Sequence, residues 1–456
     1  MIRPISATGQ GVSLSPKSLH GQPPTGSWPA RKILRRPGLR NNSLSGEIPS
    51  NLSRCQNLVE LDLGRNNFID IFPNEFESLT KLVYIILDQN NLTRKIPKFL
   101  GNFTSLVKIS AKSTNIHGII PDTLGQLSNL WFFEFPSNML SGILPSSFFN
   151  LSSLTVINLP QNLIGGNLRA DFAQKFPKLT FLYLSINKFT GPIPVSLSNA
   201  SNLQELALSY NLFTGTVPSY DQQTRLTWFA IGDNKLGNGK PDNLNFVSSL
   251  ANCTNLTVLA FGANNLGGVL PKSLCNFTQL TQLIITGSLI SGNIPSEIGQ
   301  LVNINRLVLS NNQLMGRVPE SIGNLENVVE LSLRDNSLSG SIPISIGNLT
   351  LLSRLNLQYN HLEGTVPYSL SNCRKLQLLL LNHNNLNGDI PKEIFSLSSL
   401  TISLDLSDNH FVGSLPSEVS NLKNLVSFNI SNNKMSGVIP PSLGACTSLV
   451  VLSVRI

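Results

Sequence analysis

Apolar and polar positions follow a pattern that repeats every 24 residues over much of this chain. The clearest stretch, residues 301–372, divides into three matching units: LVNINRLVLSNNQLMGRVPESIGN, LENVVELSLRDNSLSGSIPISIGN and LTLLSRLNLQYNHLEGTVPYSLSN. Each unit reads LxxLxxLxLxxNxLxGxIPxxLxN. Its LxxLxL segment alternates apolar and polar residues, which predicts a short strand with one face on a core. A fixed period of this length is typical of a solenoid, so we predict an α/β-type solenoid with a parallel β-sheet on its concave face.

One asparagine marks each unit and shows how far the pattern extends. It gives 17 repeats of about 24 residues from Leu39 onward, with Thr114 and Ser288 at the two positions that lack it. The asparagines are Asn42, Asn66, Asn90, Asn138, Asn162, Asn187, Asn211, Asn234, Asn264, Asn312, Asn336, Asn360, Asn384, Asn409 and Asn433. The chain turns inward at this position, where backbone groups lose their strand partners. The side-chain amide both donates and accepts, so we expect it to satisfy those groups in its own and adjacent coils.

The spacing breaks once, between Asn234 and Asn264, which lie 30 residues apart. The additional residues fall within 237–256, GNGKPDNLNFVSSLANCTNL. Insertions in solenoids form loops on one face, so we expect this segment to bulge from the convex or lateral side.

Composition is consistent with one long core and argues against nucleic-acid binding. Apolar residues make up 41% of the chain and charged residues 13%, and the formal net charge is +8. Seven Lys or Arg residues lie in residues 1–40, which contain no acid, leaving 26 of the 33 basic residues against 25 acidic ones in the remainder. The repeats are therefore nearly neutral and lack the clustered basic face that nucleic acids require.

The two parts of the chain differ in character. Residues 1–38 are rich in Gly, Pro, Ser and Arg, and we expect a disordered basic leader without repeat phase. Residues 39–456 are predicted to form the solenoid. No run approaches the ~18–20 apolar residues of a membrane span. The N-terminal residues also lack the apolar segment of roughly 7–15 residues that is typical of a secretory signal.

The LSGxIPxxLGNLxxL units over residues 39–456 resemble the plant-specific class of leucine-rich repeats found in receptor-like kinase ectodomains. The expanded coil ending NFVSSLANCTNL resembles the matching coil of the subfamily containing the bacterial elongation-factor receptor and the rice bacterial-blight resistance kinase. Family members carry a signal peptide, Cys-containing caps, a membrane helix and a kinase. We find none of these here, so we expect a truncated receptor ectodomain without its C-terminal cap.

The resemblance implies extracellular recognition of a peptide or protein ligand at the plasma membrane, in innate immunity or development. An extended ligand would contact several coils, and a co-receptor kinase would bind ligand and ectodomain together. Two alternatives remain. One is a soluble inhibitor of cell-wall-degrading enzymes, which uses the same repeat in a shorter, fully capped solenoid; the other is a fragment that does not signal.

Aromatic residues mark the predicted concave face. Tyr84, Phe132, Phe181 and Trp228 lie six residues before the recurring Asn, and Trp131, Tyr183 and Tyr210 lie nearby. Exposed aromatic residues are enriched at binding hot spots, so this column is a candidate ligand site. The structural alternative is that the rings stack on each other or shield the edge of the core.

Charged residues continue the same column at Arg306, Glu330 and Arg354, one coil apart. One interpretation is a polar pocket for a peptide carboxylate or acidic side chain. The other is a surface ladder of ion pairs, each contributing little.

Cysteines and glycosylation motifs are less specific. Four cysteines occupy a position that is Leu in other repeats, where we expect small core residues: Cys55, Cys253, Cys373 and Cys446. Cys275 lies one coil from Cys253, so a bridge between them is conceivable. Six glycosylation motifs share one phase on the predicted convex turn: Asn102, Asn150, Asn199, Asn252, Asn276 and Asn348.

Catalytic motifs are absent from the sequence. We find no GxSxG, P-loop, HExxH or strand-associated GxGxxG pattern. No Cys or His spacing suggests a metal site, and we predict neither a cofactor nor an enzymatic activity for this chain. His383 is expected to be a solvated surface residue.

Overall fold

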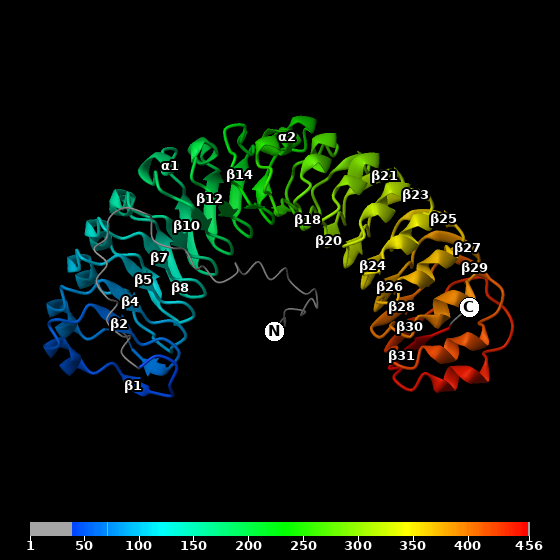
Figure 1. Ribbon diagram of the computed structural model, residues 1–456, viewed down its shortest axis with the longest axis horizontal. Helices are drawn as coiled ribbons and strands as arrows, with labels where there is room; N and C mark the ends of the chain where they lie inside the picture. Colours follow the sequence, from blue (N-terminus) through cyan, green and yellow to red (C-terminus); the bar gives the residue numbers. More distant parts are fainter. Residues whose placement is uncertain (1–38, 71, 455–456) are drawn as a thin grey trace. The chain divides into compact units, whose positions relative to one another are not determined.

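The computed structural model describes residues 39–70 and 72–454. The leader predicted over residues 1–38 lies outside the described residues. The described residues form one unit, which curves as a solenoid with short strands along its inner edge (Figure 1). No helix in the described ranges is long and apolar enough to cross a membrane.

The predicted LxxLxL strands are confirmed as a parallel sheet on the concave face. Each strand has three residues and pairs in register with the strand of the next coil, as in Glu330↔Arg354. The strands are β2 (Glu60–Asp62), β4 (Tyr84–Ile86), β5 (Lys108–Ser110), β7 (Phe132–Glu134), β9 (Val156–Asn158), β11 (Phe181–Tyr183), β13 (Glu205–Ala207), β15 (Trp228–Ala230), β17 (Val258–Ala260), β18 (Gln282–Ile284), β20 (Arg306–Val308), β22 (Glu330–Ser332), β24 (Arg354–Asn356), β26 (Leu378–Leu380), β28 (Ser403–Asp405), β30 (Ser427–Asn429) and β31 (Val451–Ser453). The middle residue of each strand faces the core, and the outer two face the concave side.

The recurring asparagine forms the predicted hydrogen-bond ladder. Asn360 Oδ1 accepts from the backbone N–H of Leu338 in the preceding coil at 3.0 Å. Its Nδ2 donates to the carbonyls of Leu333 and Leu357, both at 3.0 Å. The same pattern recurs along the array and pairs backbone groups that no strand ladder reaches. At the first exception, the Thr114 hydroxyl donates to the ladder residue of the next coil, Asn138, at 2.9 Å.

A second set of strands, which the sequence pattern did not predict, lies along the LxG segments. They form a pair and two six-stranded parallel sheets. The pair is β1 (Ser45–Glu47) and β3 (Asn67–Ile69). The first sheet contains β6 (His117–Ile119), β8 (Met139–Ile143), β10 (Leu163–Asn167), β12 (Lys188–Pro192), β14 (Leu212–Gly215) and β16 (Lys235–Leu236). The second contains β19 (Ser291–Asn293), β21 (Gln313–Arg317), β23 (Ser337–Ser341), β25 (His361–Gly364), β27 (Asn385–Asp389) and β29 (His410–Val412).

The glycine of LxG has a structural requirement within these strands. Gly340 has φ +71°, a conformation that residues with a Cβ rarely adopt. A Cβ there would also lie 2.9 Å from the Arg317 side chain of the preceding coil. The glycine therefore combines a left-handed backbone with close approach of the neighbouring coil, rather than only a tight bend.

Short helices cover the convex side, most of them starting directly after the proline of IP. They are mainly 3-10 helices: η1 (Ser50–Arg54), η2 (Asn74–Ser78), η3 (Lys98–Asn102), η4 (Asp122–Gln126), η5 (Ser146–Asn150), η6 (Val195–Asn199), η7 (Pro241–Leu244), η8 (Leu250–Asn252), η9 (Lys272–Asn276), η10 (Ser296–Gln300), η11 (Glu320–Asn324), η12 (Ile344–Asn348), η13 (Tyr368–Asn372), η14 (Lys392–Ser396), η15 (Ser417–Asn421) and η16 (Pro441–Ala445). Two are α-helices, α1 (Phe172–Lys175) and α2 (Asn245–Ser249). Proline fixes φ at the start and loses no required hydrogen bond there.

The insertion bulges from the convex side, as expected (Figure 1). Its additional residues form η7, α2 and η8 in direct succession. The coil after the insertion, that of Asn264, has no named strand in the second set, so the two six-stranded sheets end at β16 and begin again at β19. The insertion thus lengthens the convex arc while the concave sheet continues without interruption from β15 to β18.

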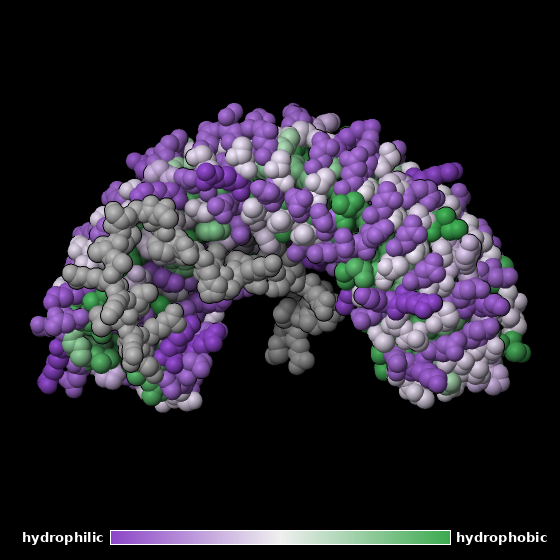
Figure 2. Space-filling view, viewed as in Figure 1, coloured by the Kyte–Doolittle hydropathy of each residue, from purple (hydrophilic) through white to green (hydrophobic). Residues whose placement is uncertain are grey.

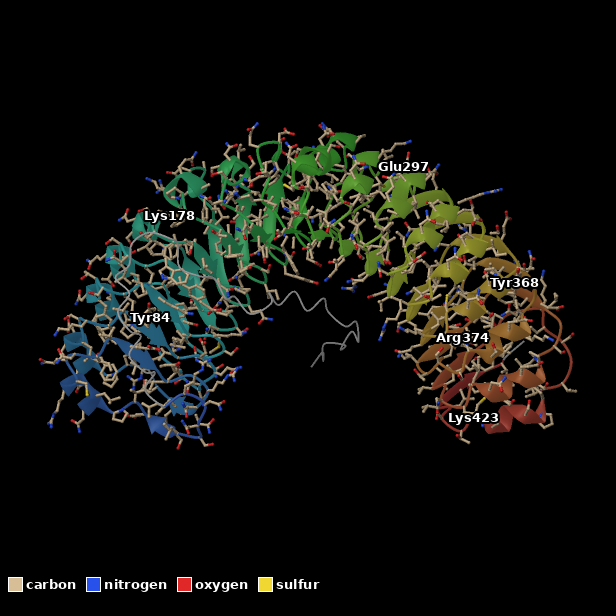
Figure 3. The ribbon with its side chains drawn as sticks, in the orientation of Figure 1. Tyr84, Lys178, Glu297, Tyr368, Arg374 and Lys423 are labelled. Atoms are coloured by element: carbon tan, nitrogen blue, oxygen red, sulfur yellow. The ribbon has the colours of Figure 1, made fainter. Side chains whose placement is uncertain are left out.

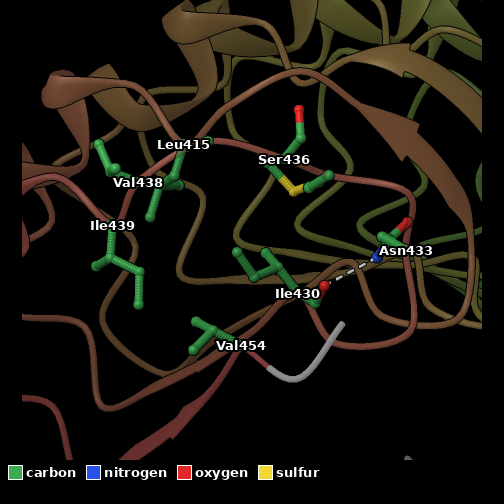
Figure 4. Close-up of a pocket in the computed structure, with 9 residues that line it drawn as sticks. Leu415, Ile430, Asn433, Ser436, Val438, Ile439 and Val454 are labelled. Atoms are coloured by element: carbon green, nitrogen blue, oxygen red, sulfur yellow. Dashed lines mark hydrogen bonds between the residues drawn. The ribbon is translucent and has the colours of Figure 1, made fainter.

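One continuous apolar core fills the space between the strand and helix layers, and polar residues cover much of the outer rim (Figure 2). In the last described coils, apolar side chains around Ile430, Ile439 and Val454 line a pocket of about 60 Å³ (Figure 4). Leu452 is 45% exposed, whereas the equivalent Phe428 one coil earlier is fully buried. In the interior of the array the following coil covers this position.

Candidate ligand-binding surface

The first residues of the concave strands form one row across the sheet, which we call the first-residue row. Register places Phe181, Glu205 and Trp228 side by side, at the ~4.8 Å spacing of adjacent strands. The predicted column is therefore confirmed as a spatial row. Its members are Glu60, Tyr84, Lys108, Phe132, Val156, Phe181, Glu205, Trp228, Val258, Gln282, Arg306, Glu330, Arg354, Leu378, Ser403, Ser427 and Val451.

The aromatic candidates differ in how much of each side chain is exposed to solvent. Tyr84 and Tyr210 are exposed, at 38% and 50%. Trp131, Phe181 and Trp228 are half-buried.

Two of the seven aromatic candidates are buried rather than exposed to solvent. Phe132 is 4% exposed and Tyr183 is 3% exposed. Their neighbours on the same face cover them, as the contacts described next show.

The Phe132 ring already contacts a cation of the same chain. Lys108 Nζ lies 4.2 Å from the centroid of the Phe132 ring, a cation–π contact between adjacent members of the first-residue row. The indole of Trp131 also contacts the ring, with centroids 5.3 Å apart in a T-shaped arrangement. Phe132 is therefore a structural residue in this conformation.

The Tyr183 hydroxyl is hydrogen-bonded to a carboxylate. Its hydroxyl donates to Glu205 Oε2 at 2.6 Å, and its ring stacks on Phe181 at 6.2 Å with an interplanar angle of 24°. Burial raises the pKa of the Glu205 carboxyl, and the Tyr183 hydrogen bond opposes that rise. Burial and the contact with Glu205 raise the pKa of the Tyr183 hydroxyl well above its usual value, so this hydroxyl remains a donor.

A second tyrosine–carboxylate pair lies beside the first, in the turns that follow β13 and β15. Burial is the largest cause raising the pKa of both Tyr210 and Asp233, and the Asp233 charge raises the pKa of Tyr210 further. The nearby Tyr210 hydroxyl opposes the rise of the Asp233 pKa. We call the six residues of the two pairs and their ring neighbours the acidic aromatic patch: Phe181, Tyr183, Glu205, Tyr210, Trp228 and Asp233.

The charged candidates further along the row also differ, because two of them form an ion pair and the third does not. Arg306 Nε lies 2.7 Å from Glu330 Oε2, so these two neutralise each other as the surface-ladder interpretation predicted. Such half-exposed pairs contribute up to about 1 kcal/mol. Arg354, on the other side of Glu330, has no ion-pair partner within residues 39–70 and 72–454.

A polar network crosses β5, β7 and β9 on the third strand residues. The Ser110 hydroxyl lies 2.6 Å from Asp88 Oδ1 and 2.8 Å from Glu134 Oε2. Asn158 Nδ2 donates to Glu134 Oε1 at 2.8 Å. The Ser110 hydroxyl has one hydrogen and can donate it to only one of these two carboxylates at a time. The arrangement therefore favours a proton on either Asp88 or Glu134. Burial is the largest cause raising the pKa of Glu134, and the Asp88 charge adds to it.

The cysteines fit the core interpretation with one exception. Cys253, Cys275, Cys373 and Cys446 are buried and unbridged, so no disulfide joins Cys253 to Cys275. Burial raises the pKa of Cys253, Cys275 and Cys373 to about 11.

Cys55 corrects the prediction, because it is exposed. The Cys373 thiol lies against the preceding coil, 3.5 Å from the carbonyl of Ile346. The equivalent neighbour of Cys55 would fall near residue 28, outside the described residues.

All six predicted glycosylation asparagines are exposed at the last residue of a convex helix. They lie opposite the concave row, on the side where Glu297 and Tyr368 also project (Figure 3). His383 is half-exposed as expected, but it is not simply solvated. Its ring stacks on Tyr359 at 4.3 Å, and its Nε2 lies 3.4 Å from Asp408 Oδ2.

Comparison with known proteins identifies the repeat. The leucine-rich-repeat family models match residues 34–92 and seven segments: 178–200, 303–325, 327–349, 351–373, 375–397, 401–422 and 424–446. The ectodomain of the receptor kinase HAESA from Arabidopsis is 32% identical, with a TM-score of 0.74 over 91% of this chain and 74% of that one. The chain belongs to the leucine-rich-repeat ectodomains of plant receptor kinases.

Other members of this ectodomain family are also similar. The Arabidopsis receptor kinase GASSHO1/SCHENGEN3, solved with CASPARIAN STRIP INTEGRITY FACTOR 2, is 32% identical with a TM-score of 0.79. The match covers 91% of this chain and 52% of that one, so this chain spans about half of that ectodomain. The Arabidopsis receptor-like kinase EFR is 48% identical over 48 residues, which are 10% of this chain and 5% of EFR.

Sequence reasoning found Glu330 on this surface but missed Glu205 and Asp233. Glu205 occupies the same repeat position as Phe181 and Trp228, and a search of that position for charge as well as aromaticity would have found it. Asp233 had no such signal, because its approach to Tyr210 depends on two turns in adjacent coils. Lys108 also belongs to the row, and its position over Phe132 required the structure.

Proposed function

We propose that this chain is the ligand-recognition ectodomain of a plant receptor kinase or receptor-like protein, acting outside the cell in innate immunity or development. Its ligand would be a peptide or protein bound across several coils of the concave sheet. The similarity to HAESA, solved with the peptide hormone IDA and the co-receptor SERK1, supports this proposal and a co-receptor as second partner. The chain itself would bind and not catalyse, and signalling would require other domains or partners.

The observation that carries the proposal is the first-residue row with its half-exposed rings. Phe181 and Trp228 present aromatic surface from a rigid sheet, and such residues dominate binding energy at interfaces. Side chains from neighbouring coils lie one strand apart, so an extended ligand perpendicular to the strands would meet a new coil at every step.

A display experiment tests this directly. The chain, secreted with an added signal, is panned against a random peptide library. Selected peptides are then measured on a Phe181→Ala/Trp228→Ala variant and on Tyr368→Ala, which alters an exposed ring on convex helix η13. We expect the concave variant to bind about tenfold or more weakly, as for hot-spot residues, and the convex control to bind normally. Failure to select any peptide, or equal sensitivity to both variants, would overturn the proposal.

Secretion itself has a separate readout. We propose that the six convex asparagines carry N-glycans when the chain is secreted, because all are exposed at helix ends. Asn429 is also in an Asn-x-Ser/Thr motif, but it lies half-buried on concave strand β30 and accepts hydrogen bonds from Ser431. Glycopeptide mass spectrometry should find glycans on the six and none on Asn429. Unmodified convex sites in the secreted protein would contradict this assignment.

A further inference from the structure

We infer that the acidic aromatic patch binds a basic side chain, lysine or arginine, of a peptide ligand. This inference rests on the proposed function and specifies the chemistry of one part of that surface. Glu205 lies between Phe181 and Trp228 in the first-residue row, with Tyr183 donating to it. A carboxylate flanked by rings suits a cation, since charge pairing and cation–π attraction act on the same group.

The same row contains two intramolecular versions of this contact. Phe132 already has the Lys108 ammonium over its ring, and Glu330 is already paired with the Arg306 guanidinium. In the part of the chain that the structure describes, neither Glu205 nor the rings beside it have such a cation. At Phe181, Glu205 and Trp228 the row therefore presents aromatic rings and a carboxylate together, without such a cation among the described residues.

On the concave strands and turns around the patch, the charge has one sign, whereas Lys188 and Lys235 lie in the second strand set. From β7 to β18, the concave strands and the turns after them contain three acids, Glu134, Glu205 and Asp233, and no Lys, Arg or His. The nearest concave bases are Lys108 and Lys112 on one side and Arg306 on the other, and Lys108 and Arg306 are engaged as described above. A cation from a ligand would meet no like charge across this stretch, and an acidic ligand residue would meet only repulsion.

The neighbouring positions leave the rings and acids prominent. The third residues of β13, β15 and β17 are Ala207, Ala230 and Ala260. Glu205 and Asp233 are half-buried, and this partial removal from water raises the pKa of both carboxyls. An incoming ammonium or guanidinium would relieve that desolvation cost, so binding would stabilise the ionised forms. Among the described residues, the buried Trp228 indole N–H has no hydrogen-bond partner.

The test uses the full chain and a random 12-residue display library panned in parallel on three proteins. These are the wild type, the isosteric double variant Glu205→Gln/Asp233→Asn, and Glu330→Gln as a control. The control removes a carboxylate of the same row that already has an internal partner. Circular dichroism and melting temperature verify that the variants fold.

We expect peptides selected on the wild type and on Glu330→Gln to share a Lys or Arg at one aligned position. That preference should disappear on the double variant. Replacing the shared basic residue by Gln in a selected synthetic peptide should weaken binding to the wild type about tenfold, as loss of a charge-assisted contact does. This last measurement needs no protein variant, so it remains decisive if the double variant fails to fold.

Each remaining outcome overturns the inference in a recognisable way. Selected peptides without a shared basic residue would refute the inference and leave the proposed function standing. Equal loss of the basic preference on Glu330→Gln would show general charge attraction and no specific site. If no peptide is selected on any protein, the proposed function and this inference both fail.

Discussion

The hydroxyl of Tyr183 donates to the carboxylate of Glu205 on the neighbouring strand, 2.6 Å away. Tyr183 is 3% exposed, so its hydroxyl has little access to water as an alternative partner. The bond fixes the carboxylate between Phe181 and Trp228 and opposes the rise of its pKa. A buried hydroxyl and a half-buried carboxylate thus satisfy each other on the concave surface.

Replacing this tyrosine should affect both stability and titration. Tyr183→Phe removes the donor and leaves the carboxylate less well solvated, which should cost about 1–3 kcal/mol locally and raise the pKa of Glu205 further. Amide exchange in β11 and β13 measures the first effect, and the pH dependence of peptide binding measures the second. Tyr210→Phe, at a 50% exposed residue, is the matched control and should change amide exchange less. Equal effects would contradict the buried-pair account.

Ionisation of Glu134 should lower the free energy of unfolding as the pH rises from the acidic range. Its pKa is raised above 4.5 in the folded state, so between that value and the folded pKa the folded state holds a proton that the unfolded state has released. Stability therefore falls as pH rises through this window. The positive charges of Lys108 and Lys112 lower the pKa of Glu134, and the negative charge of Asp88 raises it.

Glu134→Gln should remove this pH dependence. The introduced amide oxygen can accept from Asn158, and its nitrogen can donate to Ser110, whose hydroxyl then serves Asp88 alone. We expect a higher melting temperature than wild type near neutral pH and a smaller difference near pH 4.5, the lower end of the window. A variant that melts below the wild type at neutral pH would refute the shared-proton interpretation.

The asparagine ladder should be costly to break at any interior coil. Asn360→Ala leaves the Leu338 N–H and two carbonyls without partners, which should cost about 2 kcal/mol, or roughly 30-fold in local opening. Repeat arrays need not unfold in one step, so amide exchange at Leu338 is the measurement. Asn360→Thr should lose less, as the natural Thr114 suggests. The amide of Leu140, bonded to distant Asn162, should be unaffected.

The cysteines should differ sharply in reactivity. Thiolates are the reactive species, and three of the buried thiols have pKa values of about 11. We expect a maleimide to label only Cys55 in the native protein and all five cysteines after denaturation. Cys55→Ser should abolish native labelling. Labelling of a second native thiol, read by mass spectrometry, would show that the core opens near that cysteine.

The sequence by itself determined the repeat, its register and the buried columns. Each LxxLxL segment must place its leucines inward to bury them, and Asn360 and its equivalents have only one geometry that satisfies the adjacent coil. These features repeat with the chain, so local pattern was sufficient to predict them. The same reasoning placed Tyr84, Phe181, Trp228 and Glu330 on one row.

The tertiary structure alone decided which aromatic residues of the concave face are left uncovered by other side chains of the chain. Phe132 and Tyr183 share the aromatic character of Phe181, yet Trp131 and Lys108 cover one and Glu205 binds the other. The second sheets likewise depend on pairing between LxG segments that have weak strand propensity because of their glycines. Exposure, pairing and pKa depend on side chains a whole coil away, about 24 residues along the chain, and no single-repeat pattern contains that information.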